Sequence, residues 1–483
     1  MTARHVAIVG GGLAGISAAL ECRRAGAAVT LLESRGRLGG AAFSFTREGM
    51  TADNGQHVFL RCCTAYRQLL DELEANHLVT LQDRLSIPVV APGGRHATLT
   101  RLPAPAPLHL AATLSRYPFL SLAERASAAR AMLALRRIDF EDPRVDERSF
   151  GEWLREHHQS PAAIDALWGL IVRPTINLVP DEASLAQVAQ VFQVGLLRDA
   201  SAGDIGYARA PLSEIHDVAA RRALQSRGVD VRLRHGATTI VPLEAGFQIE
   251  ISGAPTVSAD VVILAVPPDR AARLLPSGSG ITPGQLTGLG RSPIVNVHVV
   301  YDRPVMDEPF AAGVRTPVQY VFDRTDTAGL TSGQYLVVSL SAAEAELEMT
   351  GEELRGRYLP ALAEVFPAAS DAGVESFFVT REHSATFRAA PGVRALRPQA
   401  RTALPGLILG GAWTDTGWPA TMEGAVRSGL LAAHEALMAQ VPEPSTELTT
   451  AVASVNGNGT GQNGHAVSRN GGRPLSVPVK GRS

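Results

Sequence analysis

A glycine-rich turn near the start of the chain constrains the fold more than any other feature. Residues 6–9 form a short apolar run with β-branched members. The glycines follow as Gly10-x-Gly12-x-x-Gly15, and residues 16–24 show helical periodicity. Between a strand and a helix, Gly10 permits a tight turn, Gly12 lets backbone amides approach a pyrophosphate, and Gly15 lets the helix pack closely. The positive end of the helix then faces the phosphates, which predicts a dinucleotide-binding turn.

An acidic residue follows the glycines at the sequence separation that is typical of dinucleotide-binding units. Glu33 ends the next apolar run and follows Gly15 by eighteen positions, near the roughly 20 at which a carboxylate accepts hydrogen bonds from ribose hydroxyls. This combination favours an adenine dinucleotide as the ligand. A glycine-rich turn that only packs is the alternative, and it is disfavoured because strand, helix and acid are all in register.

Composition excludes several classes of partner. The chain has 483 residues and a formal net charge of −2, without a basic block of the kind that nucleic acid demands, so we expect no nucleic-acid partner. The three cysteines, Cys22, Cys62 and Cys63, lack zinc spacing and form no disulfide framework, which predicts no metal site and favours the reducing cytoplasm. The only lysine is Lys480, so no lysine is available to a site in the folded part of the chain.

Hydropathy gives no sign of a membrane span. Nowhere does an uncharged apolar stretch reach the roughly 18 residues that a spanning helix needs, so any membrane contact is expected to be peripheral, at the inner face of the membrane. In residues 108–135 arginines alternate with leucines and Met132. This segment is interpreted either as a surface that contacts a membrane or as a helix that lies on its own domain.

Further apolar runs far along the chain belong to the same nucleotide-binding unit. Residues 228–233, 259–268 and 407–411 read as strands, so this unit is predicted to be discontinuous. The predicted class is α/β, with a Rossmann-like nucleotide-binding domain and a second, α+β domain that combines helices with a mixed or antiparallel sheet. We place the nucleotide-binding domain at 1–75, 206–275 and 396–440, the substrate-binding domain at 76–205 and 276–395, and a disordered tail at 441–483.

Several motifs together resemble the flavin amine oxidase and phytoene desaturase superfamily. They are the opening glycines, residues 33–41, the sequence Asp53-Asn54-Gly55-Gln56-His57, residues 261–268, and residues 413–429. The resemblance spans roughly residues 5–437, and residues 413–425 are most similar to the squalene-associated FAD-dependent desaturases of hopanoid biosynthesis. It implies FAD as cofactor and a long-chain isoprenoid of the squalene type as substrate.

The resemblance also implies which residues contact FAD. The pyrophosphate would lie on the glycine-rich turn, the adenosine ribose on Glu33, the adenine on the backbone of Ala237, and the flavin N1/O2 edge on the amide of Met422. The complete set of implied contacts is Gly10, Gly11, Gly12, Leu13, Ala14, Gly15, Glu33, Ser34, Arg35, Gly39, Gly40, Ala41, Gly55, Gln56, His57, Ala237, Gly411, Ala412 and Met422.

One position departs from the superfamily pattern. After the last strand the superfamily has Gly-Asp, and the aspartate bonds to the cofactor, whereas this chain has Gly411-Ala412. Loss of that charge-assisted hydrogen bond is expected to weaken FAD binding by roughly 1.5 to 3 kcal/mol. Asp415 could replace it in part.

The implied reaction reduces hydroxysqualene to squalene, with hydride from reduced FAD and loss of water. Such a step needs a general acid, and Asp53 and His57 are the candidates. The alternatives are that Asp53 caps a turn and that His57 only supports the flavin. The sequence does not indicate the electron donor that reduces FAD.

Three other functions share this fold. Carotenoid or phytoene desaturation needs the same apolar tunnel and moves hydride in the opposite direction. Amine oxidation is disfavoured, because those enzymes typically place a lysine beside flavin N5 and this chain has none outside the tail. A non-catalytic lipid-binding relative that has lost flavin is kept open by Ala412 and disfavoured by the intact glycines with Glu33.

Overall fold

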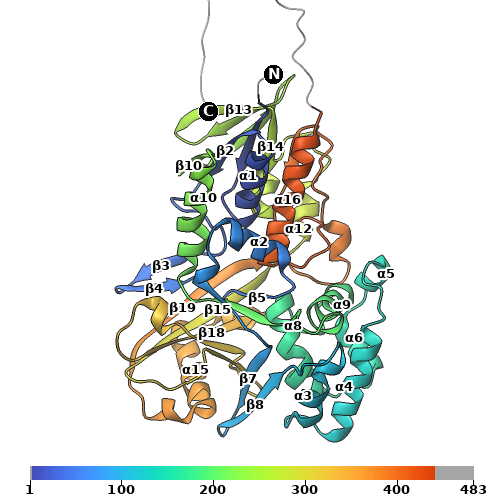
Figure 1. Cartoon of the computed structure of the whole chain (residues 1–483), viewed down its shortest axis with the longest axis vertical. Helices are drawn as coiled ribbons and strands as arrows, with labels where there is room; N and C mark the ends of the chain where they lie inside the picture. Colours follow the sequence, from blue (N-terminus) through green and yellow to red (C-terminus); the bar gives the residue numbers. More distant parts are fainter. Residues whose placement is uncertain (1–2, 441–483) are drawn as a thin grey trace, which may run out of the picture. The chain divides into compact units, whose positions relative to one another are not determined.

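The glycine-rich turn lies at the end of the central strand of a parallel sheet in the computed structural model, which describes residues 3–440 (Figure 1). The strand order is β10-β2-β1-β14-β20, and every neighbouring pair is parallel. The strands are β1 (His5–Val9), β2 (Ala28–Glu33), β10 (Asp230–Leu233), β14 (Val261–Leu264) and β20 (Leu407–Leu409). Strands from three distant parts of the chain therefore form one Rossmann-like sheet, which confirms the predicted fold class.

Two helices from opposite ends of the chain pack tightly together beside this sheet. They are α1 (Leu13–Arg24) and α16 (Met422–Met438), drawn side by side in blue and orange-red in Figure 1. The contact depends on Gly429, where an added Cβ would lie 2.2 Å from the carbonyl oxygen of Ala14. This close approach brings the N-termini of both helices to the same cavity.

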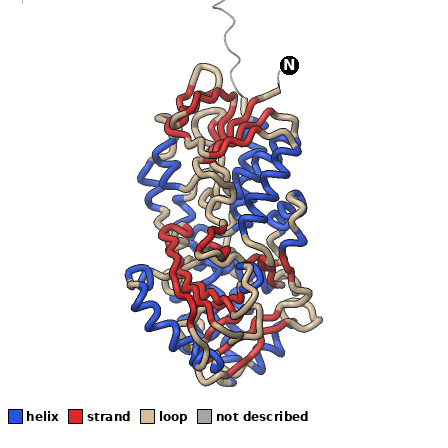
Figure 2. Tube along the Cα trace, turned by 90° about the vertical axis from the view of Figure 1, so that its left-hand side faces the viewer, coloured by secondary structure: helices blue, strands red, loops and turns tan. Residues whose placement is uncertain are grey.

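A second, seven-stranded sheet has the order β19-β15-β18-β17-β16-β7-β8. It is mixed, because β16 and β7 are parallel while the other pairs are antiparallel. The strands are β7 (Ser86–Ala91), β8 (Arg95–Thr100), β15 (Ser292–Tyr301), β16 (Phe310–Gly313), β17 (Tyr320–Asp323), β18 (Gln334–Ser341) and β19 (Val374–Thr386). Figure 2 shows the strands of the two sheets in separate regions, with helices beside each.

Alternation along β15 gives this sheet two different faces. Val295 and Val297 pack in one apolar cluster with Leu354 of α15 (Gly351–Val365). Asn296 and His298 point the other way, as the period of two in a strand requires, and both are fully buried. On this face the side chain of Asn296 donates a hydrogen bond at 3.0 Å to the Asn54 oxygen, in the loop before His57.

A group of short helices between β8 and β9 covers the second sheet. Its largest buried side chains include Trp168, Phe150 and Phe192, which pack on one another. Its members are η2 (Leu108–Leu110), α3 (Ala111–Arg116), α4 (Leu122–Leu135), α5 (Pro143–Asp146), α6 (Phe150–Glu156), α7 (Pro161–Ala163), η3 (Ile164–Trp168), α8 (Gly169–Ile176), α9 (Leu185–Phe192) and η4 (Gln193–Leu197).

The remaining elements connect these parts. A three-stranded antiparallel meander is inserted next to the parallel sheet, and η3, η4 and η5 are π-helical turns. The other elements are α2 (Thr64–Glu72), β3 (Ser44–Arg47), β4 (Met50–Asp53), β5 (Val58–Leu60), η1 (Asn76–Leu78), β6 (Val79–Leu81), β9 (Ile205–Ala208), η5 (Glu214–Ala219), α10 (Ala220–Ser226), β11 (Ala237–Pro242), β12 (Phe247–Ile251), β13 (Ala254–Ala259), α11 (Pro268–Leu274), α12 (Pro283–Gly288), α13 (Thr325–Ala328), α14 (Glu344–Glu348), η6 (Pro367–Ser370) and η7 (Val393–Leu396).

The structure does not test the predicted tail or the predicted domain boundaries. The predicted disordered tail, residues 441–483, lies outside the described residues. The boundaries of the two predicted domains stay a prediction. Within residues 3–440, no helix is both long enough and apolar enough to cross a bilayer.

Candidate active site

A single large cavity connects the glycine-rich turn to the second sheet and its helices. Its volume is about 1370 Å³, and its walls are mostly apolar. At one end it is lined by the turn after β1, and beyond His57 and Met422 it continues between the second sheet and helices α8 and α9. This arrangement provides room for a long ligand with a polar end at the turn and an apolar part among the helices.

The three glycines of the turn after β1 have two different roles. Gly10 and Gly15 allow close packing, and Gly12 leaves room for a ligand. Gly10 has φ +112°, and an added Cβ there would lie 2.2 Å from the Ala265 oxygen. At Gly15 a Cβ would lie 1.9 Å from the Gly10 oxygen. At Gly12 the only atom of residues 3–440 within 4 Å of an added Cβ is the Cα of Gly40 at 3.7 Å, so this glycine faces open space.

The first amides of α1 are directed to the same space. Gly12 is the N-cap and supplies no side chain to bond these amides, while Leu13 and Ala14 line the cavity. Backbone donors at a helix N-terminus, together with the helix dipole, form an anion site. The turn therefore fits a diphosphate group.

Glu33 holds its carboxylate at the cavity wall. Its Oε2 accepts a hydrogen bond from the Gly11 amide at 2.8 Å, and its Oε1 accepts from the Arg35 amide at 2.7 Å and from the Ser34 hydroxyl at 3.2 Å. The side chain lines the cavity at the end of β2. A carboxylate fixed in this way can accept hydrogen bonds from ribose hydroxyls.

A half-buried aspartate that the sequence did not single out holds the loop containing Gly39 and Gly40. Asp217, in the π-helical turn η5, accepts a hydrogen bond from the Leu38 amide at 2.8 Å and pairs with Arg221 at 2.6 Å. The loop then runs along the cavity at Gly39, Gly40 and Ala41. The π-helical turn has no local sequence signature, so only the structure reveals this support.

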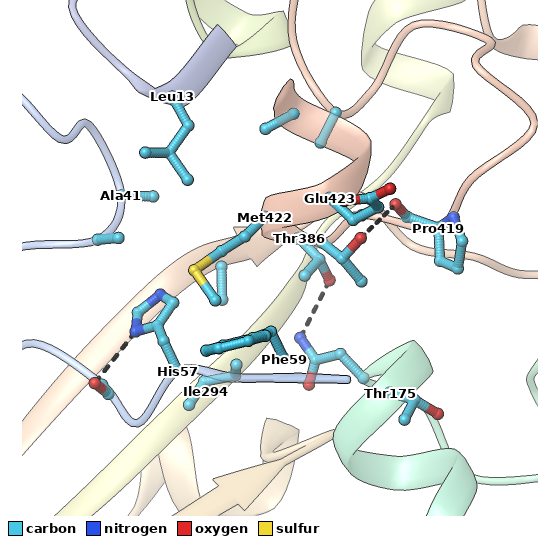
Figure 3. A pocket seen from close by; sticks show the side chains of 18 of the residues that line it. Leu13, Ala41, His57, Phe59, Thr175, Ile294, Thr386, Pro419, Met422 and Glu423 are labelled. Atoms are coloured by element: carbon cyan, nitrogen blue, oxygen red, sulfur yellow. Dashed lines mark hydrogen bonds between the residues drawn. The ribbon is translucent and has the colours of Figure 1, made fainter. Parts of the chain in front are cut away.

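His57 and Met422 lie where the polar end of the cavity meets the apolar part. In Figure 3 the side chains of His57, Phe59 and Met422 point into the same part of the cavity. The Nδ1 of His57 lies 3.2 Å from the Gly55 oxygen, which favours the tautomer with hydrogen on Nδ1. Burial lowers the pKa of His57 below its usual value, while the Gly55 hydrogen bond and the charges of Asp53 and Glu382 oppose this shift.

The predicted acid Asp53 lies behind the cavity wall. Its carboxylate pairs with Arg324 at 2.9 Å and accepts hydrogen bonds from the Ser44 hydroxyl at 2.6 Å and the Leu212 amide at 3.0 Å. Both members of the pair are buried, and Asp53 does not line the cavity. Its carboxylate therefore acts on the cavity through its charge, not by contact.

Glu382 is an acidic residue of the cavity that the sequence analysis did not identify. It lines the cavity from β19, and its Oε1 accepts a hydrogen bond from the Asn54 amide group at 3.1 Å. Asn54 in turn donates to the Ala41 oxygen at 2.9 Å. The signal that could have identified Glu382 is non-local, because β19 reaches this place only by pairing with β15.

Most of the implied cofactor contacts come together in this one cavity. Gly11 and Gly15 do not line it, since the Gly11 amide bonds to Glu33 and Gly15 faces Gly10. Those that do line it are Gly10, Gly12, Leu13, Ala14, Glu33, Ser34, Arg35, Gly39, Gly40, Ala41, Gly55, Gln56, His57, Ala237, Gly411, Ala412 and Met422.

Two further observations bear on how well a flavin dinucleotide fits. The side-chain nitrogen of Gln56 is buried without a hydrogen-bond partner among the described residues, as expected for a donor that a ligand would use. Ala412 lines the cavity without a carboxylate, and its carbonyl oxygen accepts a hydrogen bond from Arg397 at 3.2 Å. Burial lowers the pKa of Arg397 to about 10. We call the glycine-rich turn, Glu33 and residues 39–41 the cradle. The cradle thus fits FAD, apart from the aspartate that Ala412 replaces.

Comparisons with known proteins agree with this site. A family model described as flavin containing amine oxidoreductase matches residues 13–437. A hydroxysqualene dehydroxylase of Sinorhizobium fredii is 29% identical over 461 residues, which cover 90% of this chain and 98% of that protein. A 15-cis-phytoene desaturase of Synechococcus elongatus is 26% identical over 459 residues, which cover 90% of this chain and 96% of that protein.

A solved structure shares the fold. Cyclohexylamine oxidase from Brevibacterium oxydans superposes with a TM-score of 0.66 at 19% identity, covering 90% of this chain and 99% of that one. The family match begins at Leu13, just after the glycine-rich turn, and spans Glu33, the His57 loop and the N-terminus of α16, all at the cofactor end of the cavity. The chain therefore belongs to the flavin-containing amine oxidoreductase family and is an FAD-dependent oxidoreductase.

Proposed function

We propose that this protein reduces hydroxysqualene to squalene. The observation that carries the proposal is the cavity of about 1370 Å³, which runs from the FAD cradle into an apolar region between the second sheet and the helices. A C30 isoprenoid alcohol matches such a region, because it buries a long hydrocarbon chain and places one hydroxyl group at the polar end. The similarity to the hydroxysqualene dehydroxylase of Sinorhizobium fredii, over nearly its whole length, supports the same substrate.

Residues of the cradle hold the cofactor. The amides of Gly12, Leu13 and Ala14 would bind the pyrophosphate, Glu33 would bind the ribose, and the first turn of α16 at Met422 would contact the flavin, since all of these residues line the cavity. When bound and reduced, FAD supplies a hydride. The positive end of α16 favours negative charge at that edge.

His57 is the proton donor in this proposal. Its ring lies in the cavity wall, and with hydrogen on Nδ1 directed to Gly55, its Nε2 is free to take up a proton and pass it to the leaving hydroxyl. Burial lowers the pKa of His57, and the charges of Asp53 and Glu382 oppose this shift. The apolar walls exclude water that would otherwise recapture the allylic cation.

A membrane surface as the source of substrate is part of the proposal. Leu110 and Leu114 line the cavity from η2 and α3, while Leu108 and Leu122 of the same region are 62% and 79% exposed. Large exposed leucines beside an apolar cavity favour contact with acyl chains. We propose a cytoplasmic protein that binds peripherally to the inner face of the membrane.

The domain boundaries belong to the proposal as well. Residues 1–75, 206–275 and 396–440 would hold FAD, and residues 76–205 and 276–395 would hold the isoprenoid. The parallel sheet and the glycine-rich turn lie in the first set, and the second sheet and the short helices lie in the other.

The test offers two substrates to the protein reconstituted with FAD. With reduced cofactor, in the absence of oxygen, hydroxysqualene should give squalene, identified by mass spectrometry. With oxidised cofactor, phytoene should remain unchanged. If phytoene is dehydrogenated and no squalene forms, the proposal is wrong and the protein is a desaturase. A His57→Gln variant that retains FAD but forms squalene at least ~100-fold more slowly would support the proton-donor role.

A further inference from the structure

Two adjacent cysteines lie in the wall of the FAD cavity and have no part in the function above. Cys62 and Cys63 both line the cavity, immediately before α2 (Thr64–Glu72). Cys62 is partly exposed and Cys63 is buried. The third cysteine, Cys22, is fully buried in α1 away from the cavity.

The two thiols differ in reactivity. The interaction with the Cys63 thiol lowers the pKa of Cys62, while burial and the charge of Glu423 oppose this shift. The same interaction, together with burial, raises the pKa of Cys63. Cys63 is also the N-cap of α2, so the pair lies at the positive end of that helix. Because Cys62 is partly exposed at the cavity wall and Cys63 is buried, Cys62 is the accessible nucleophile of the pair and Cys63 the thiol that keeps its proton.

An oxidant for this pair arises in the same cavity. A reduced flavin that meets O₂ passes two electrons to it and forms H₂O₂, as reduced flavins do in general. The thiolate attacks peroxide, and susceptibility follows thiolate character and access. A nucleophilic cysteine with a second thiol directly beside it is the arrangement that converts a sulfenic acid into a disulfide.

We propose that Cys62 and Cys63 form a peroxide-reactive thiol pair. The pair is oxidised by the H₂O₂ that forms when the reduced cofactor reacts with O₂. In the first step the Cys62 thiolate attacks H₂O₂, the O–O bond breaks, and Cys62 sulfenic acid and hydroxide result. In the second step the Cys63 sulfur attacks Cys62, the S–S bond forms, and water leaves. In total, two thiols and one H₂O₂ give one disulfide and two waters.

The disulfide is expected to be easily reversed. Cα atoms joined by a trans peptide are about 3.8 Å apart, less than the roughly 4.4 to 6.8 Å of ordinary disulfides, so a bond between neighbours is strained. Strained disulfides have high reduction potentials and are readily reduced by dithiols. A dithiol reductant should therefore restore the two free thiols of Cys62 and Cys63.

The pair is linked to the flavin end of the cavity through one side chain. The Glu423 carboxylate accepts hydrogen bonds from the amides of Ala65 at 3.1 Å and Tyr66 at 2.7 Å, just after the cysteines. Glu423 follows Met422 in the first turn of α16. A new bond between Cys62 and Cys63 distorts the start of α2 and so disturbs the turn that faces FAD.

The test measures thiol oxidation in the full-length protein with FAD bound. FAD is reduced without oxygen, air is admitted with or without catalase, free thiols are alkylated, and peptides are mapped by mass spectrometry. We expect a disulfide between Cys62 and Cys63 that forms at least about tenfold faster than any oxidation of Cys22. Catalase should leave most of it, because the peroxide arises inside the cavity, and dithiothreitol should reverse it.

Two variants keep the inference falsifiable. Cys63→Ser should stop at Cys62 sulfenic acid, which dimedone traps, and Cys62→Ser should give neither product. The inference is overturned if the wild-type pair stays reduced, if Cys22 oxidises as fast, or if Cys62→Ser traps as much dimedone as Cys63→Ser. Because none of these measurements uses an isoprenoid, their outcome is independent of the substrate proposed above.

Discussion

A single methyl group at the glycine-rich turn has different consequences at neighbouring positions. At Gly10 and Gly15 an added Cβ meets backbone oxygen atoms at 2.2 and 1.9 Å, whereas at Gly12 it meets only one carbon atom at 3.7 Å. The first two glycines therefore serve the packing of strand and helix, and Gly12 serves the ligand.

Gly12→Ala should separate cofactor binding from folding. Its methyl group occupies the space of the pyrophosphate, so FAD affinity should fall at least about tenfold, while the unfolding free energy without FAD should change by less than about 0.5 kcal/mol. Titration with FAD and urea unfolding measure the two quantities. Gly15→Ala is the control and should lose stability even without FAD. Equal effects of both variants on stability would contradict this division of roles.

The pH dependence of turnover should identify the protonation state of His57. Because burial lowers the pKa of His57, the ring is mostly neutral at pH 7, and a proton donor gains active form as the pH falls. We therefore expect turnover of hydroxysqualene to rise as the pH decreases below about 6.5. His57→Gln should flatten the profile, and an unchanged profile in that variant would exclude the role.

Two fully buried histidines should make folding stability depend on pH. Burial lowers the pKa of His216 and of His298 to about 3 in the folded protein. The unfolded chain binds protons at about 6.5, so it binds more protons than the folded state and stability falls as the pH drops. Between pH 7.5 and 5 the unfolding free energy should decrease by about 2 kcal/mol for each histidine. Urea unfolding checks this, and His298→Gln should remove about half of the pH-dependent loss.

At the scale of elements, α16 supports both the flavin and the start of α2. The carboxylate of Glu423 is 1% exposed, accepts two amide hydrogen bonds from α2 and pairs with Arg427 at 2.7 Å. This one side chain replaces the cap that the N-terminus of α2 otherwise lacks.

Glu423→Gln should destabilise the protein through this contact. The amide group of glutamine offers one acceptor in place of two, so one buried donor is left unpaired at a cost of about 2 to 3 kcal/mol. Urea unfolding measures the loss. Glu21→Gln removes an exposed pair with Arg24 and serves as the matched control, with a change within about 0.5 kcal/mol. A similar loss in both variants would refute the capping role of Glu423.

Local patterns allowed the sequence to predict the elements around the cofactor. The strand, turn and helix from His5 to Arg24, and the strands at 230–233, 261–264 and 407–409, follow from apolar periodicity and glycine position. For the second domain the sequence predicted only the combination of helices with a mixed or antiparallel sheet, and the seven-stranded mixed sheet with its helices agrees with that combination.

Long-range contacts could not be predicted from such patterns. Asp53 is buried by an ion pair with Arg324, 271 positions away, and Glu382 reaches the cavity only because β19 pairs with β15. The π-helical turn that carries Asp217 has no local signature. The residues that tune the site were therefore missed or misplaced, although its glycines and His57 were found.

At the scale of the molecule, the apolar part of the cavity and the exposed leucines belong to the same helices. This arrangement supports uptake of substrate from a bilayer. A double variant, Leu108→Gln with Leu122→Gln, tests whether these leucines bind the membrane. Sedimentation with vesicles of phosphatidylethanolamine and phosphatidylglycerol should fall severalfold in this double variant, because the exposed apolar area is lost. Leu243→Gln alters another exposed leucine, 48% exposed, in the β11–β12 turn and should bind as before. Equal binding of all variants would contradict the proposed surface.

Hydride transfer to a C30 alcohol requires the FAD cradle and the apolar cavity to act together. A single-turnover experiment without oxygen tests it most directly: the protein with reduced FAD is mixed with hydroxysqualene, and absorbance near about 450 nm is followed while products are quantified. We predict that the absorbance of oxidised flavin returns and that one squalene forms for each FAD. If the cofactor stays reduced and no squalene appears, the account is wrong.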